Sequence, residues 1–201
     1  MVANWIGTRN HMRERAILFA REMVLALRAG TKTQTRRLVT PQPDRWTHND
    51  GQGLRLTMGK RELKFPFGVV GDRLWVREKW GYQRQFLERG APAGGEFVYA
   101  TEGSPAGATV AAWKPSLYMP RCACRMLLEV TSARAERLKQ ISADDARAEG
   151  CPPMLWEGPV AWFAEYWTHF NAARGMGWQA NPWVWVVNFK VLDAAEANSP
   201  A

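Results

Sequence analysis

A long β-like segment, Cys124–Leu138, constrains the fold of this chain more than any other feature. Shorter strand-like segments precede and follow it, so strands dominate the middle of the sequence. They are Arg15–Ala20, Arg36–Thr40, Leu74–Glu78, Glu96–Thr101 and Asn181–Leu192. Five or six strands with only three short helices predict an α+β fold around a mixed, barrel-like sheet.

The first helix is predicted at Arg21–Gly30, directly after the first strand. Met23, Val24 and Leu27 fall at helical spacing, which gives the segment one apolar side. Gly30 suits the position just past the helix end, because glycine adopts the left-handed conformation that often closes a helix.

Two further helices are predicted in the C-terminal third of the chain. In Ile141–Gly150, Ser142 is a favourable N-cap and Asp145 sits three residues on, which makes a capping-box-like pair. Gly150 closes this short helix. The segment Val160–Gly175 is amphipathic. Its apolar face carries Val160, Phe163, Trp167 and Phe170.

Turn-forming residues separate these elements. Pro41–Gly53 is polar and rich in such residues, so it is predicted to be a long surface loop. Gly90–Gly95 and Gly103–Ala108 are also predicted loops, and Gly71-Asp72 marks a tight turn. Trp113–Arg121 is interrupted by prolines and is not expected to form a central strand.

The length fits one domain. The 201 residues are 46% hydrophobic and 23% charged, which is ordinary for a globular protein. We expect a single domain over residues 12–192, a disordered extension at 1–11 and a disordered tail at 193–201. No apolar run approaches the length of a spanning helix and no secretory signal is visible, which predicts a cytoplasmic protein without a membrane partner.

The three cysteines, Cys122, Cys124 and Cys151, do not suggest a disulfide framework, because their number is odd and no export signal precedes them. Cys122 and Cys124 resemble half of a metal site, but none of the three histidines gives zinc-finger spacing with them. If the segment is a strand, the two side chains share a face and simply pack. We therefore expect no metal site and no cofactor.

The charge balance points to a nucleic acid or a nucleotide as the partner. The formal net charge is +8, and most of the 27 basic side chains are arginines. Arginine binds phosphate bidentately and stacks on bases. Eleven tryptophans add stacking platforms, although most are expected in the core. A solvated basic surface, or the composition bias of a GC-rich genome, would explain the same balance.

The stretch Gly30–Arg37, GTKTQTRR, carries three threonines, three basic residues and no apolar residue. It connects the first predicted helix to the second predicted strand. Composition alone indicates an ordinary basic turn.

Several stretches together resemble the ASCH domain, a PUA-like β-barrel family. They are ALRAGTKTQTRR (26–37), GDRLWVRE (71–78), WKPSLYMPR (113–121), LLEVTSARAERLKQISADDARAEG (127–150) and NPWVWVVNFK (181–190). The combination is similar in particular to ASCH-related proteins of bacteriophages and prophages, and it extends from about Ile17 to Val191. The resemblance implies a PUA-like mixed β-barrel with short flanking helices that binds RNA or a nucleoside.

One small bacterial branch of this family removes the acetyl group from N4-acetylcytidine. Its GRKTITIR turn is similar to Gly30–Arg37, so its catalytic lysine and threonine fall on Lys32 and Thr35. Its catalytic glutamate falls on Glu149. The resemblance therefore implies a metal-independent amidohydrolase of an acylated cytidine or a related modified nucleoside. Residues near 40–67 and 80–113 are insertions relative to that branch.

Acyl transfer from an amide needs a nucleophile, a base, a proton for the leaving amine and donors for the oxyanion. Thr35 can serve as nucleophile and Lys32 as its base if burial or nearby positive charge lowers the pKa of Lys32. Both face one cavity only if Lys32 lies in the turn before the strand begins. Glu149 lies in the last turn of its helix, where the helix dipole disfavours a carboxylate. That position suits a residue that exchanges a proton.

Seven further residues are predicted to bind the substrate, as charged groups of the same pocket or as platforms on which a base stacks. They are Arg36, Arg37, Trp75, Arg77, Glu78, Trp113 and Trp183. Core packing explains each tryptophan taken alone, and the arginines could instead form salt bridges elsewhere.

Two other functions fit the sequence. A non-catalytic RNA-binding module would use the same basic residues to neutralise phosphates. A ribonuclease ranks lower, because none of the three histidines falls in the resembling motifs.

Overall fold

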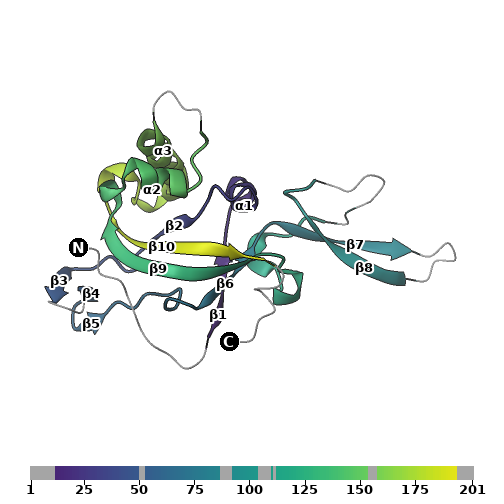
Figure 1. The fold of residues 1–201 in the computed structure, drawn as a ribbon, viewed down its shortest axis with the longest axis horizontal. Helices are drawn as coiled ribbons and strands as arrows, with labels where there is room; N and C mark the ends of the chain where they lie inside the picture. The colour runs from purple at the N-terminus through teal and green to yellow at the C-terminus, as the bar shows by residue number, and fades with distance from the viewer. Residues whose placement is uncertain are drawn as a thin grey trace.

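The computed structural model describes residues 12–49, 53–86, 92–103, 110, 112–153 and 158–193. Its main layer is a five-stranded sheet in the order β1-β6-β9-β10-β2 (Figure 1). β1 and β6 pair in parallel, and the other neighbours pair antiparallel. The bounds are β1 Glu14–Leu18, β2 Gln34–Leu38, β6 Arg73–Arg77, β9 Leu127–Arg137 and β10 Trp183–Leu192. The predicted α+β class with a mixed sheet is confirmed.

The sheet curls around its own apolar face. Alternate residues of its strands, such as Ile17, Leu74 and Leu128, meet in one buried core. On edge strand β2, Arg37 Nη2 donates to the carbonyl oxygen of Leu18 at the end of edge strand β1, at 2.7 Å. A side chain thus bridges the two edges, and the sheet has the curvature of a barrel while its described strands pair as an open sheet.

Three α-helices are described, as predicted: α1 Arg21–Arg28, α2 Ala143–Ala148 and α3 Pro159–Asn171. α1 connects β1 to β2 and buries its apolar side in the core of the curled sheet. α2 and α3 pack together on the opposite face of β10, where Ala146 and Phe163 meet Val184 and Val186. Edge strand β2 therefore has a helix on each side.

The prediction that Pro41–Gly53 is a surface loop is wrong. This region contains β3 (Arg45–Asn49) and the start of β4 (Gly53–Met58), which continues to β5 (Arg61–Glu62) in a three-stranded sheet. Polar composition is typical of loops, so it did not indicate strands here. These strands form because they pair with one another through backbone hydrogen bonds, which do not require apolar side chains. Leu56 of β4 reaches the main core.

The predicted loop Gly90–Gly95 is also partly wrong, since β8 (Pro92–Tyr99) pairs with β7 (Trp80–Phe86). This hairpin extends away from the rest of the molecule (Figure 1). Glycines weaken the local strand signal, so the pairing with β7 decides the conformation here.

Trp113–Arg121 forms no central strand, as its prolines predict; it contains the short helix η1, Ser116–Tyr118, and leads into η2, Arg121–Ala123. Cys122 lies in η2 and Cys124 precedes β9, so this pair is not in a strand. Residues 1–11, 104–108 and 194–201 of the predicted disordered and loop segments lie outside the described residues. No helix within the described residues is long and apolar enough to cross a membrane.

The cap of α2 gives a first test. Ser142 Oγ accepts a hydrogen bond from Asp145 N at 3.0 Å. We expect Ser142→Ala to lower the free energy of unfolding by about 1 kcal/mol, because a helix donor loses its partner. Urea denaturation measures this, and Ser142→Asp, which keeps a capping oxygen, is the matched control. Equal stability of Ser142→Ala and the wild type would contradict the role of the cap.

Candidate active site

A buried ion pair between Lys32 and Glu149 organises the site. Lys32 Nζ donates to Glu149 Oε2 at 2.9 Å and to the Glu149 carbonyl oxygen at 2.7 Å. The two residues also form an isolated antiparallel bridge, next to which Thr33 N donates to Ala148 O at 2.9 Å. Only 1% of Lys32 and 4% of Glu149 is exposed. The pair ties the turn before β2 to the C-terminal end of α2.

Burial lowers the pKa of Lys32 to about 8, and the charges of Arg37 and Arg36 act in the same direction. The neighbouring carboxylate of Glu149 opposes this shift. Compared with an ordinary lysine, a far larger share of Lys32 is therefore neutral near physiological pH. This is the condition that a lysine base must meet.

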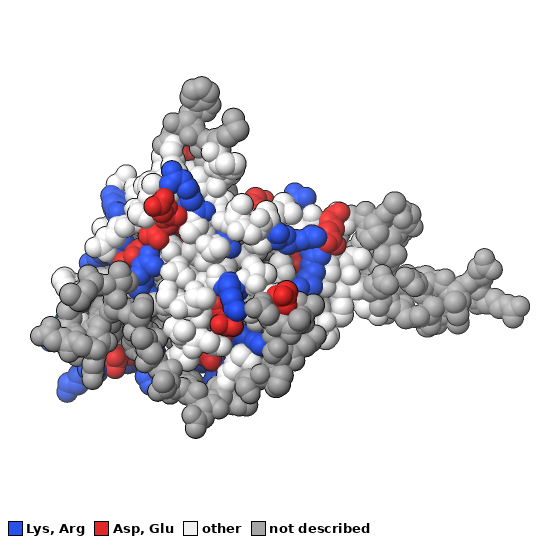
Figure 2. Space-filling view, in the orientation of Figure 1, with Lys and Arg blue, Asp and Glu red and all other residues white. Residues whose placement is uncertain are grey.

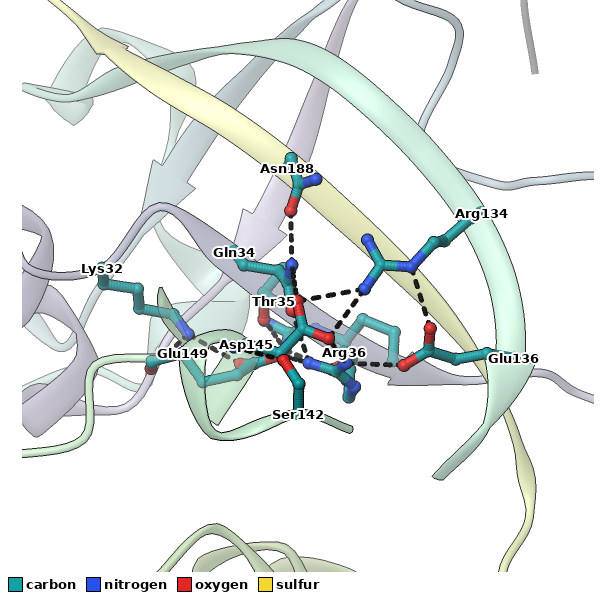
Figure 3. A network of polar contacts seen from close by, with 11 residues as sticks. Lys32, Gln34, Thr35, Arg36, Arg134, Glu136, Ser142, Asp145, Glu149 and Asn188 are labelled. Carbon is teal, nitrogen blue, oxygen red and sulfur yellow. Dashed lines mark hydrogen bonds and ion pairs between the residues drawn. The ribbon is translucent and has the colours of Figure 1, made fainter. Parts of the chain in front are cut away.

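Arg36 is enclosed by acceptors, as Figure 3 shows. Its Nη1 donates to Gln34 Oε1 and, at 3.2 Å, to Glu149 Oε1. Its Nη2 donates to Glu136 Oε1 at 2.6 Å and to Asp145 Oδ2 at 3.0 Å. Because both terminal nitrogens are engaged with the protein, the side chain of Arg36 holds Glu149 in place. We therefore do not include Arg36, which was predicted to bind the substrate, among the residues proposed to contact it.

A second layer of charges surrounds Arg36. Arg134 donates to both oxygens of Asp145, at 3.1 and 3.0 Å, and to Glu136 Oε2 at 2.8 Å. Burial raises the pKa of Asp145, but the hydrogen bond from Gln34 and the charges of Arg36 and Arg134 outweigh it, so the net shift is downward. Asp145 thus stays ionised and serves this network with its side chain, while only its backbone N–H joins the predicted capping pair.

Thr35 lies in β2 on the face opposite Arg36, because side chains alternate along a strand. It is 1% exposed, and its Oγ accepts a hydrogen bond from Arg37 Nη1 at 2.6 Å. Arg37 also donates to Arg36 O at 3.0 Å and to Leu18 O at 2.7 Å. A cation beside a hydroxyl oxygen stabilises negative charge that develops there.

These side chains share one cavity of about 390 Å³. Lys32 precedes β2 and Thr35 lies within it, yet both line the cavity together with Glu149, Arg36 and Arg37. The structure thus brings the three residues predicted as catalytic, and the two neighbouring arginines, to one place. Their roles in catalysis remain predictions.

The rest of the cavity wall comes from residues that the motifs did not indicate. They are Leu18, Phe19, Ala20, Met23 and Leu38, and from α3 and the turn after it Phe163, Tyr166, Trp167, Phe170, Asn171 and Arg174. One signal was present in the sequence: the apolar stripe of Val160–Gly175. Phe163, Trp167 and Phe170 of that face line the cavity, and Phe170 is 50% exposed.

Three of the other predicted substrate-binding residues lie elsewhere, at the end of β6. Trp75 is buried in a small separate core with Leu127, and Arg77 stacks over its ring at 4.4 Å. Glu78 is 1% exposed and accepts hydrogen bonds from Arg125 at 2.8 and 3.0 Å. These residues do not line the cavity of Lys32 and Thr35.

The remaining two, Trp113 and Trp183, are also absent from the cavity lining. Trp183 is buried, with Arg137 4.8 Å above its ring and Trp46 at 6.0 Å. Trp113 is half-buried. The proposed site therefore excludes these two tryptophans, together with Trp75, Arg77 and Glu78.

No family model matches the sequence, and no curated protein matches it. A solved ASCH domain from Lactobacillus crispatus JV V101 is similar in structure, with 15% sequence identity and a TM-score of 0.44. The match covers 90% of this chain and 80% of that one. The resemblance to ASCH domains rests on the sequence motifs.

No group of three or more His, Cys, Asp or Glu side chains that could hold a metal ion occurs in the part of the chain that the structure describes.

We expect substitutions of the two partners of the ion pair to lower the free energy of unfolding by different amounts. In Lys32→Met, Glu149 keeps its contact with Arg36 at 3.2 Å, so the loss should be small. In Glu149→Gln, Lys32 loses the carboxylate that favours its ammonium form, so folding must bury either an uncompensated charge or a lysine that has given up its proton, and we expect a loss of about 2 to 3 kcal/mol. Chemical denaturation at neutral pH measures both. Equal losses in the two variants would contradict the assigned arrangement.

Proposed function

We propose that this protein is an amidohydrolase that removes the acyl group from N4-acetylcytidine or a related acylated nucleoside. One observation carries the proposal: a buried lysine with a pKa of about 8 lines the same cavity as a buried threonine hydroxyl. The cavity volume of about 390 Å³ lies within the range typical of small-molecule sites. The resemblance to the deacetylating ASCH branch supports the choice of substrate.

In the first half of the reaction, neutral Lys32 accepts the proton of the Thr35 hydroxyl while Oγ bonds to the acyl carbon. Arg37, 2.6 Å from this oxygen, stabilises the charge that develops there. The carbonyl electrons move to the acyl oxygen, which becomes an oxyanion. When the intermediate collapses, the bond to the nucleoside N4 breaks and N4 takes the proton from Lys32. The acyl group is left as an ester on Thr35.

In the second half, water attacks the ester and its proton passes to Lys32. The carboxylic acid leaves and Thr35 regains its proton, so no electron donor or further reactant is needed. Glu149 contacts Lys32 Nζ at 2.9 Å throughout, which orients the lysine and provides a carboxylate that exchanges the proton with it. The reaction uses no metal ion.

A non-catalytic RNA-binding role is the second candidate, and the net charge of +8 favours it. Several surface arginines are, however, paired with carboxylates, for example Arg28 with Glu102 at 2.9 Å and Arg121 with Glu14 at 2.7 Å. On the face shown in Figure 2, basic and acidic side chains lie next to one another. The buried lysine and threonine have no evident use in binding phosphates, so the enzyme is the better-supported function.

The nucleophile is tested within a single motif. We expect Thr35→Ala to lower kcat on N4-acetylcytidine at least about 10³-fold, because the covalent step is lost. Thr33→Ala is the matched control, since Thr33 lies in the same turn but is exposed and uses only its backbone groups. Product cytidine is measured by chromatography, with circular dichroism to confirm folding.

Wild-type protein that consumes no acylated nucleoside would contradict the proposal. If the wild-type protein also bound RNA with an affinity that falls steeply with salt concentration, a non-catalytic RNA-binding function would replace the amidohydrolase as the proposed function.

The base is tested by pH. Because only neutral Lys32 can accept the threonine proton, kcat/KM should rise with pH and level off above the Lys32 pKa of about 8. The profile is measured from pH 6 to 9.5 with N4-acetylcytidine. A rate that is flat through this range would exclude Lys32 as the base.

A further inference from the structure

α3 supplies a part of the cavity wall that takes no part in the proposed mechanism. Phe163, Tyr166 and Phe170 follow one another along one side of this helix and all line the cavity. Tyr166 is the one of the three that carries a polar group. Its hydroxyl is therefore the feature of this wall that can act on a substrate by hydrogen bonding.

The ring of Tyr166 is held between two aromatic neighbours. It stacks on Trp162 with ring centroids 5.3 Å apart and an interplanar angle of 17°. The ring of Phe170 is its other neighbour, with the two ring centroids 5.0 Å apart and an interplanar angle of 58°. A ring packed in this way keeps its hydroxyl in one place before the substrate arrives, as a catalytic donor requires.

The hydroxyl of Tyr166 has no hydrogen-bond partner among the described residues, although the side chain is partly buried. Burial raises its pKa to about 12, so the group keeps its proton. The charges of Arg37 and Glu149 both act on this pKa, which means that the hydroxyl lies within electrostatic reach of the proposed reacting groups. It is a protonated donor at the cavity without an acceptor of its own.

Most other side-chain donors of the cavity wall are already engaged. Arg36 Nε has no partner among the described residues, but this atom is buried within the protein. Lys32 donates to Glu149, and both terminal nitrogens of Arg36 and of Arg37 have protein acceptors. Trp167 Nε1 donates to Met176 O at 2.8 Å, and Asn171 Nδ2 donates to Trp167 O at 2.9 Å. Arg174 also lines the cavity, but it is exposed and its charge is solvated.

We propose that Tyr166 Oη donates a hydrogen bond to the acyl oxygen of the substrate as that oxygen becomes the oxyanion of the tetrahedral intermediate. The inference rests on the proposed amidohydrolase function. It assigns the one component of acyl transfer, the oxyanion donor, that Lys32, Thr35 and Glu149 leave open. Tyr166 transfers no proton in this role and only strengthens its hydrogen bond as negative charge accumulates.

The test removes the hydroxyl alone. We expect Tyr166→Phe to lower kcat on N4-acetylcytidine about 10²-fold with little change in KM, because the contact forms only in the transition state. Tyr118→Phe, which makes the same chemical change at a side chain that is 69% exposed and outside the cavity, should keep the wild-type kcat. Arg174→Gln is the competing test, because Arg174 also lines the cavity and carries donors that could make the same hydrogen bond.

A second measurement does not depend on turnover. In the Thr35→Ala background, Tyr166→Phe should weaken binding of a tetrahedral methylphosphonamidate analogue of the substrate about 10²-fold. Binding of N4-acetylcytidine itself should be nearly unchanged. Calorimetry measures both affinities.

The outcomes separate the two proposals. Wild-type turnover with an unchanged kcat in Tyr166→Phe, or with a rise in KM alone, overturns the role of Tyr166 and leaves the amidohydrolase intact. A large loss of kcat in Arg174→Gln and none in Tyr166→Phe moves the role to Arg174 and also overturns the proposal. Absence of turnover and of analogue binding by the wild type overturns the proposed function, and the role of Tyr166 with it.

Discussion

The buried contact between Lys32 and Glu149 is the interaction on which the rest of the site depends. A charge removed from water must find a compensating charge, or its ionisation becomes unfavourable. Lys32 and Glu149 compensate each other across 117 residues of sequence, and in doing so they join the turn before β2 to the end of α2. The position of Thr35 follows, because it lies three residues after Lys32 in the strand that this contact anchors.

The network around Arg36 supports this contact from the outer face of β2. Arg36 holds Glu149, and Asp145, Glu136 and Arg134 hold Arg36. Such a network contributes little net stability compared with an apolar core of the same volume. Its evident effect is to hold the Glu149 side chain beside Lys32, whose pKa burial lowers to about 8. The arrangement serves chemistry better than it serves folding.

Sequence reasoning succeeded where the signal was local or carried by several motifs together. The long strand β9, the Ser142 cap and the helix α1 each follow from neighbouring residues. It failed for β3, β4, β7 and the first part of β8, because pairing with a partner strand decides these elements and their polar or glycine-containing sequences do not indicate it. The strand predicted at Glu96–Thr101 overlaps the second part of β8. Sequence reasoning also placed Trp75, Arg77, Glu78, Trp113 and Trp183 at the site, although they do not line the cavity.

The sequence by itself determined the α+β class and the chemical groups of the turn Gly30–Arg37, and by resemblance it singled out Glu149. Only the tertiary structure decided what those groups do to one another. A pKa depends on burial and on charges nearby in space, so the shift of Lys32 exists only once α2 and the arginines of β2 surround it. In the same way Arg36 became a support for Glu149, and Tyr166 joined the cavity, because α3 packs against α2 beside the edge strand.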